Sequence, residues 1–320
     1  MTANIKPMIR LLRSHREIQS VVLSNIATLA AKPEQKALLV PHLKAFFVRS
    51  SDPTHIKLQK LEILTNLASE GTIGIILREF QAYISSSDRE LIASTIQAIG
   101  RCAITISEVT ETCLNGLVNL LSNRDDNVVG ESVCVIRKLL QLNPTAHKDI
   151  IRHLAKLVET IQVPMAKASI LWLIGEYCEQ VPTIAPDVLR VAVKTFPKED
   201  NIVKLQILNL AAKLLTVNPQ QTSLLAVYAF NLAKYDVNYD IRDRSRFLKA
   251  LVMPGHIGSG DDGSDARTFS NMAHQILMAT KPAPVLESRF KERMEFQMGT
   301  LSHFLNIRTS GKTDLKKPRL

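Results

Sequence analysis

The chain has 320 residues, of which 46% are hydrophobic and 5% aromatic, and its formal net charge is +10. This length exceeds what one compact core usually holds, so it predicts two domains or an elongated array, and the hydrophobic content excludes a wholly disordered chain. The basic residues concentrate at the ends, with ten Lys and Arg against three Asp and Glu in residues 1–60 and nine against four in residues 281–320. The residues between the two ends lack a basic stripe, which argues against a nucleic-acid-binding protein. The predominance of aliphatic over aromatic residues favours helices packed on helices.

The first predicted element is a helix at the N-terminus. Residues 1–16 are basic but lack a continuous apolar core, which excludes a secretory signal and leaves a transit peptide as the alternative. The apolar pattern runs on through Val21, Val22, Ile26 and Leu29, and we therefore expect a structural helix. No apolar run reaches the roughly 20 residues that a membrane-spanning helix requires.

A repeat of about 36 residues organises the next part of the chain. Residues 60–64, KLEIL, return as KLQIL at residues 204–208, and helices centred on Ile96, Val133 and Ile170 lie between them. A second apolar helix precedes each of these. The predicted preceding helices are Gln35–Val48, Ile73–Ile84, Val109–Leu121, Lys148–Ile161, Pro186–Phe196 and Thr222–Lys234. Pro, Asp, Ser and Asn separate the helices, as expected for turns and helix caps.

Such a periodic helix pair predicts an all-α fold, an α-solenoid of HEAT or armadillo-like repeats wound into a right-handed superhelix. The Trp, Gly, Tyr and Pro positions of tetratricopeptide repeats do not recur. We expect the solenoid to span residues 1–254. A Gly-, Ser- and Asp-rich flexible loop at residues 255–270 should follow it, and then a terminal helix and tail at residues 271–320, with Leu301–Leu305 as an apolar anchor.

No pattern of catalytic, cofactor-binding or metal-binding residues emerges from the sequence. The glycine-rich stretch at residues 255–260 lacks the strand and the GK[ST] sequence of a phosphate loop. The eight histidines are dispersed, and none lies in an HExxH motif. The four cysteines, Cys102, Cys113, Cys134 and Cys178, each lie within an apolar helical pattern, which predicts buried, reduced thiols. We predict no enzymatic activity and no cofactor.

Two places are candidates for binding other proteins. Trp172 lies in an apolar run, where a tryptophan is either a core residue or an anchor for a partner. The charged stretch that contains Tyr239, Arg242, Asp243 and Arg244 fits three roles: a solvated salt-bridge cluster, a brace for the turn between two helices, or a contact with a partner.

Several blocks of the sequence together resemble the trunk of β-adaptins, the large subunits of clathrin-type adaptor complexes. They are FFVR at 46–49, KLQKLEIL at 57–64, IGRCA at 99–103, WLIGEY at 172–177 and YDIRDR at 239–244. The blocks RDRSRF at 242–247, KPAPVLES at 281–288 and GTLSH at 299–303 are similar to β subunits of the third adaptor complex. The resemblance runs in order from about residue 10 to residue 303, and it implies the C-terminal half of a trunk, as a fragment, a short isoform or an incomplete gene model.

This resemblance implies a non-catalytic scaffold in a vesicle coat that sorts cargo from Golgi and endosomal membranes toward lysosomes. The implied partners are the medium, small and second large subunits, with clathrin machinery reached through regions that this sequence does not match. The implied location is cytoplasmic, peripheral on those membranes, without nucleic acid. The alternative is another HEAT-type scaffold, such as a transport receptor. We also expect the N-terminal helix, with Ile9, Leu11, Leu12 and Val21, to expose an apolar face and to promote self-association.

Overall fold

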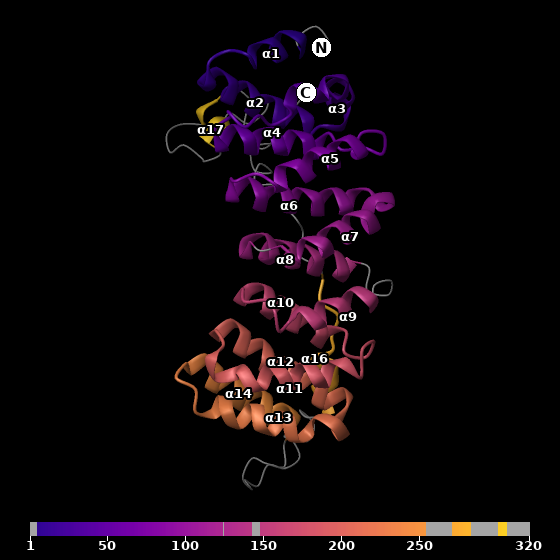
Figure 1. Cartoon of the computed structure of the whole chain (residues 1–320), viewed down its shortest axis with the longest axis vertical. Helices are drawn as coiled ribbons and strands as arrows, with labels where there is room; N and C mark the ends of the chain where they lie inside the picture. Colours follow the sequence, from indigo (N-terminus) through magenta and orange to yellow (C-terminus); the bar gives the residue numbers. More distant parts are fainter. Residues whose placement is uncertain (1–4, 124, 143–147, 254–270, 283–299, 306–320) are drawn as a thin grey trace, which may run out of the picture. The chain divides into compact units, whose positions relative to one another are not determined.

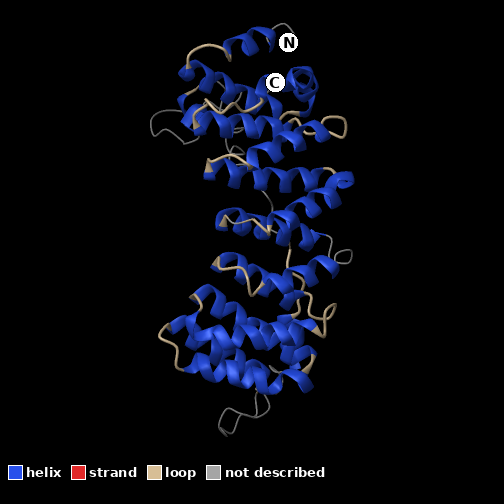
Figure 2. Ribbon diagram, in the orientation of Figure 1, coloured by secondary structure: helices blue, strands red, loops and turns tan. Residues whose placement is uncertain are grey.

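A computed structural model describes residues 5–123, 125–142, 148–253, 271–282 and 300–305. All regular secondary structure in these ranges is helical (Figure 2), as the sequence predicts. The chain divides into two compact units, one formed by residues 1–116 and 285–320 and the other by residues 117–284. The predicted loop at 255–270 and the end of the tail lie outside the described residues.

The first unit is built from helix pairs. Its helices are α1 (Ile5–Leu11), α2 (Arg16–Ala30), α3 (Pro33–Leu39), η2 (Val40–Phe46), α4 (Thr54–Asn66), α5 (Ile73–Ile84), α6 (Arg89–Thr105), η3 (Ser107–Val109) and, from the tail, α17 (Leu301–Leu305). In Figure 1, α2, α4 and α6 follow one another as a row, and α4 packs against both of its neighbours. Phe46, Ile56 and Phe80 are fully buried in this unit.

The second unit is likewise built from helix pairs. The helix α7 (Thr110–Leu120) spans the division between the units, and the helices after it are α8 (Asp126–Leu142), α9 (Lys148–Leu157), α10 (Pro164–Glu176), α11 (Ile184–Thr195), η4 (Phe196–Lys198), α12 (Asn201–Val217), α13 (Pro219–Lys234), α14 (Tyr239–Val252) and α16 (Ala273–Leu277). The second helix of each pair packs on the next second helix, so that α8, α10, α12 and α14 form one row, while α9, α11 and α13 form the other. Each pair of helices is called a layer below.

Close packing in this row depends on a glycine in α10. A Cβ atom on Gly175 would lie 3.4 Å from Cδ of Lys213 and 3.5 Å from Cδ1 of Leu210, both on α12. Glycine therefore lets the two helices approach closely, and Lys213 can reach the carboxylate of Glu176 at the end of α10. Lys281 also donates to Glu176, at 3.2 Å. The carboxylate thus connects α10, α12 and the segment after α16.

Polar caps begin several of the second helices, as the turn residues predict. The side chain of Asp88 accepts a hydrogen bond from the Leu91 N–H, that of Asp200 from the Ile202 N–H, and that of Asn238 from the Asp240 N–H. Each side chain satisfies a backbone donor that the helix itself leaves free. Pro164 and Pro219 stand at the first position of their helices, where a missing N–H costs little.

The repeat register differs from the one that the KLEIL and KLQIL motifs indicate. Lys204 is the fourth residue of α12, whereas Lys60 is the seventh residue of α4, and the fourth residue of α4 is Lys57. The motifs are therefore displaced by three residues relative to the helices that carry them. A shift of three residues is close to one helical turn, so the apolar face survives it and the sequence pattern alone does not detect it.

The N-terminal and C-terminal expectations are met in part. Leu23 and Ile26 are buried in α2, while Leu11, Ile18 and Val21 are exposed.

The cysteines are mostly buried, as the sequence predicts. Burial raises the pKa of the Cys102 thiol to about 12, and Cys113 and Cys178 are also buried, while Cys134 is half-buried. All four cysteines are free thiols.

In the tail, α17 coincides with the predicted anchor. Its buried residue, however, is His303, and not one of the leucines. None of the helices in the described ranges combines the length and the apolar character that a membrane crossing needs.

Candidate protein-binding surface

Buried ion pairs join successive layers and fix how the helices are aligned. Lys167 at the fourth position of α10 pairs with Glu199, and Lys204 at the fourth position of α12 donates to Asp236 at 2.8 Å. In the first unit, Lys57 at the fourth position of α4 pairs with Asp88 at 3.3 Å. In each pair the lysine lies on a second helix, and the carboxylate lies just before the second helix of the next layer. We call these the inter-layer ion pairs.

The carboxylate of Asp236 is held ionised by its surroundings. Burial raises the pKa of Asp236, but hydrogen bonds from Lys204 and from the Asn238 N–H, together with the charges of Lys204 and Arg242, outweigh burial and leave this pKa below its ordinary value of 3.8. The Asp236 side chain is 8% exposed and that of Lys204 is 11% exposed. The Asp236 carboxylate is therefore ionised beside Lys204 in a pair that is largely shielded from water.

The ninth positions of the last three second helices of the second unit carry larger side chains. These residues are Trp172 of α10, Asn209 of α12 and Phe247 of α14. The inter-layer ion pairs align these helices position by position, so equal positions face the same way. Arg137 contacts Trp172, and Arg244 contacts Asn209 and Phe247. We call these five residues the central stripe.

Trp172 is half-buried and is held by the preceding helix. Arg137 of α8 places its guanidinium carbon 5.9 Å from the centroid of the indole ring and donates a hydrogen bond to Ser169 Oγ at 3.3 Å. A guanidinium over an indole face is a favourable cation–π arrangement. The tryptophan is thus neither a fully buried core residue nor a free surface residue.

Arg244 connects α14 to α12 on the same stripe. Its Nε and Nη2 atoms both donate to Asn209 Oδ1, at 3.2 and 2.9 Å, and its guanidinium carbon lies 5.8 Å from the Phe247 ring centroid. Phe247 is exposed. An aromatic ring beside a positioned arginine is the composition that protein interfaces favour.

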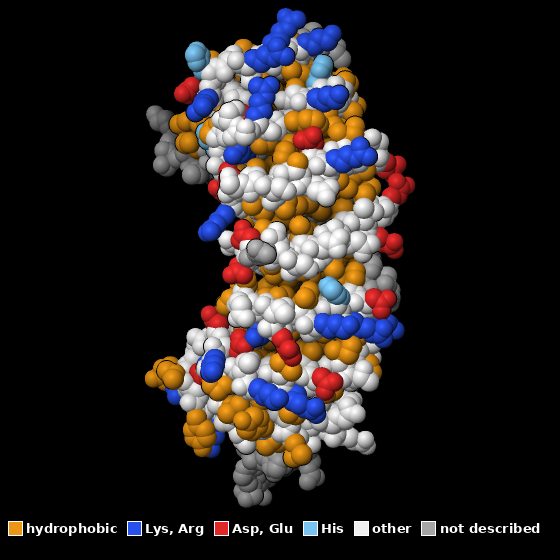
Figure 3. Space-filling view, viewed as in Figure 1, with side chains coloured by type: hydrophobic (Ala, Val, Ile, Leu, Met, Phe, Trp, Pro, Cys, Tyr) orange, Lys and Arg blue, Asp and Glu red, His pale blue; other side chains and the backbone are white. Residues whose placement is uncertain are grey.

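The end of α13 and the start of α14 carry a second exposed cluster, which we call the α14 end surface. Tyr235 is 79% exposed, Val237 93% and Tyr239 74%, and Arg242 places its guanidinium carbon 4.4 Å from the Tyr239 ring centroid. Figure 3 shows hydrophobic side chains gathered over the end of the second unit that α13 and α14 form. Apolar side chains that cluster in this way are unusual on a surface that faces only water.

The sequence-predicted residues therefore fall into two groups. Trp172 and Arg244 belong to the central stripe, while Tyr239 and Arg242 belong to the α14 end surface. Asp243 instead pairs with the exposed Arg246, three residues later on the same helix, at 3.0 Å. Sequence reasoning missed Arg137, Asn209 and Phe247, because only the helix register shows that they accompany Trp172.

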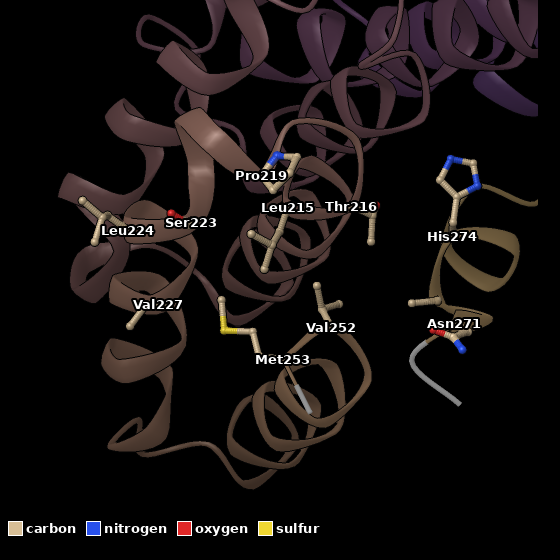
Figure 4. Close-up of a pocket in the computed structure, with 11 residues that line it drawn as sticks. Leu215, Thr216, Pro219, Ser223, Leu224, Val227, Val252, Met253, Asn271 and His274 are labelled. Atoms are coloured by element: carbon tan, nitrogen blue, oxygen red, sulfur yellow. The ribbon is translucent and has the colours of Figure 1, made fainter. Parts of the chain in front are cut away.

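A pocket of about 750 Å³ opens between α12, α13, α14 and α16. Its walls are mostly apolar, with Leu215, Leu224 and Val252 among them, and His274 stands at one side (Figure 4). The pocket borders Met253 and Asn271, and the segment between these two residues lies outside the described part of the chain. We assign no ligand to it.

Comparison with known proteins identifies the family of this fold. Residues 1–256 match the model of the adaptin N-terminal region. The chain belongs to the adaptin family. This confirms the resemblance that the sequence blocks indicate, and the matched residues include every member of the central stripe and of the α14 end surface.

Individual relatives place the adaptin chain near one type of subunit. It is 59% identical to mouse AP-3 complex subunit beta-1 over 97% of this chain and 27% of that protein, and 57% identical to mouse AP-3 complex subunit beta-2 over 97% of this chain and 28% of that protein. It thus spans little more than a quarter of the length of these relatives. A chain in a homology model of the full-length AP-3 complex in an intermediate open conformation matches with a TM-score of 0.65 and 29% identity, over 78% of this chain and 45% of that chain.

Proposed function

We propose that this adaptin chain is a non-catalytic scaffold of an AP-3-type adaptor complex, which supports the sorting of cargo from Golgi and endosomal membranes toward lysosomes and related organelles. The observation that carries the proposal is the 59% identity to an AP-3 beta subunit along 97% of the chain. The fold supports it, because stacked helix pairs offer an extended surface suited to other proteins.

The proposed partners are the medium, small and second large subunits of the complex. The medium subunit, which reads cargo in this family, binds the central stripe, and Trp172 and Arg244 are its anchors. Both side chains are positioned before a partner arrives, because Arg137 supports the indole and Asn209 holds the guanidinium. Pre-positioned side chains lose little conformational entropy on binding.

The chain works at the cytoplasmic face of membranes without crossing them. The Lys and Arg side chains in the stretches 1–60 and 281–320 attract the chain to anionic lipid. Helices that are aligned by buried ion pairs fit this role, since a scaffold must hold its partners in a fixed geometry.

Co-expression of the chain with the AP-3 medium subunit, followed by affinity capture and size exclusion, tests this function. We expect a one-to-one complex, and we expect Trp172→Ala to weaken it at least tenfold, as for an interface anchor. The control is Tyr228→Ala, which removes an exposed aromatic ring on α13, away from the stripe. A helical wild-type chain that captures neither the medium subunit nor, in parallel co-expressions, the small and second large subunits would refute the proposal.

A further inference from the structure

Arg242 occupies the position that provides the cation of the inter-layer ion pairs. It is the fourth residue of α14, as Lys57 is of α4, Lys167 of α10 and Lys204 of α12. In α6 and α8 the fourth residues are Ile92 and Val129, which are buried aliphatic side chains. The fourth position of α4, α6, α8, α10 and α12 therefore carries either a cation of an inter-layer ion pair or a buried aliphatic side chain.

The carboxylate partners also share one place. Asp88 stands directly before α6, Glu199 stands two residues before α12, and Asp236 stands three residues before α14. Each belongs to the turn between the first and second helix of the following layer. A lysine at the fourth position thus meets an acidic residue only when another helix pair is stacked on its own.

Among the described residues, Arg242 has no such partner. Its guanidinium instead lies over the ring of Tyr239, one turn earlier on α14. Asp236 is near enough for the charge of Arg242 to lower its pKa, but the hydrogen bonds of its carboxylate are with Lys204 and the Asn238 N–H. Within the described ranges α14 ends the row of second helices, since it packs on α12 and α13, while α16 packs on α12.

The surroundings of Arg242 are those of a surface that another protein covers. Tyr235, Val237 and Tyr239 are largely exposed beside it. Apolar and aromatic side chains around an arginine are typical of the centre of a protein–protein interface. The match to the adaptin N-terminal region ends at residue 256, shortly after α14, and the next described helix, α16, packs on α12. The Arg242 side chain therefore lacks a carboxylate from a following layer among the described residues, and a partner protein can supply one.

We propose that the α14 end surface binds a helix pair of another subunit, and that this pair presents an aspartate or glutamate to Arg242 from the turn before its second helix. The contact repeats between two proteins what Asp236 and Lys204 do within this one. The proposal rests on the proposed function, because it takes the partner from among the subunits of the same complex.

A carbodiimide cross-link tests this contact directly. In Arg242→Lys, the introduced amine keeps the charge and forms an amide with an adjacent carboxylate, while the carbodiimide takes up the water that is lost and becomes a urea. The variant is co-expressed with the medium, small and second large subunits, and the linked peptides are identified by mass spectrometry. We expect residue 242 to be linked to an Asp or Glu within three residues before a helix of another subunit.

Charge reversal provides the second measurement. Arg242→Glu should weaken assembly at least tenfold, because it sets like charges against each other in a desolvated contact. The matched control is Arg190→Glu, which reverses an exposed arginine on α11. Circular dichroism and the melting temperature verify that both variants fold.

Three results would overturn the proposal. The first is a cross-link from residue 242 to Asp261, Asp262 or Asp265 of the same chain, which would make the partner internal. The second is full assembly of Arg242→Glu with no intersubunit cross-link in Arg242→Lys. The third is failure of the wild-type chain to bind any subunit, which alone among these results would also refute the proposed function.

Discussion

At the scale of single residues, the most informative feature is that buried charges connect the layers. A lysine taken out of water is costly unless a carboxylate and further hydrogen bonds compensate it. Lys204 and Asp236 meet this condition, since the carboxylate also accepts from the Asn238 N–H. Such pairs add little net stability compared with apolar packing, but they penalise any stacking in which the charges do not meet.

The first prediction concerns the loss of one partner. Asp236→Asn leaves Lys204 buried beside a neutral side chain, and we expect the free energy of unfolding to fall by about 3 kcal/mol, as for a broken buried ion pair. Urea denaturation followed by circular dichroism measures this. Asp187→Asn is the control, because it breaks an exposed pair with Arg190 and should cost less than about 0.5 kcal/mol. Equal losses for the two variants would show that the buried pair has no special role.

The second prediction follows from the lowered pKa of Asp236. Its ordinary value, 3.8, describes the unfolded chain, and the folded value is lower, so the unfolded state binds more protons in the interval between them. The stabilisation is therefore complete above pH 3.8 and is lost as the pH falls through the folded value. Asn resembles the protonated acid, so the stability difference between wild type and Asp236→Asn should shrink as the pH is lowered below about 4. A difference that stays constant from pH 7 to pH 3 would contradict this explanation.

At the scale of elements, the sequence predicts the helices well and their alignment less well. The helix Ile73–Ile84 has the predicted bounds, and Lys148–Leu157 begins at the predicted residue, because periodic apolar residues and polar caps mark such helices locally. The register is a different matter, because a shift of three residues preserves the apolar face. The central stripe depends on that register, which explains why Trp172 could be singled out from the sequence while Asn209 and Phe247 could not. The handedness of the superhelix and the domain bounds stay predictions.

The third prediction concerns α17, which the tail contributes to the first unit. His303 is 2% exposed, and its Nε2 lies 2.7 Å from Thr28 Oγ1 on α2. His303→Ala removes this contact and leaves a cavity, so we expect α17 to detach and the amides of residues 301–305 to exchange at least tenfold faster.

Hydrogen exchange with mass spectrometry, supported by a melting curve, measures this detachment. Leu305→Ala is the matched control on the same short helix, because Leu305 is exposed and its removal should leave the exchange rate nearly unchanged. Unaltered protection in His303→Ala would mean that other contacts hold α17.

At the scale of the whole molecule, the distribution of charge matters more than its sum. The terminal stretches 1–60 and 281–320 carry the excess of Lys and Arg, whereas the residues between them hold 21 basic and 23 acidic side chains. Attraction to an anionic membrane is of the order of 1 kcal/mol for each basic residue near the surface, and salt screens it. Contacts between apolar surfaces differ in this respect, because salt does not weaken them.

The fourth prediction is therefore that the chain binds vesicles containing phosphatidylserine and that binding falls steeply between 50 and 200 mM salt, roughly the range over which the screening length halves. Vesicle flotation measures it, with neutral phosphatidylcholine vesicles as the control. Binding that is independent of salt, or equal on the two kinds of vesicle, would exclude the electrostatic contribution.

The central claim is that the exposed edge of the second helices in the second unit binds another subunit. Hydroxyl-radical footprinting of the chain, free and in complex with the AP-3 medium subunit, tests this directly, because it reports the exposure of individual aromatic side chains. We predict that oxidation of Trp172 and Phe247 drops severalfold in the complex while that of Tyr228 on α13 does not change. Protection of Tyr228 with unchanged Trp172 and Phe247 would place the interface on the first helices and contradict the account.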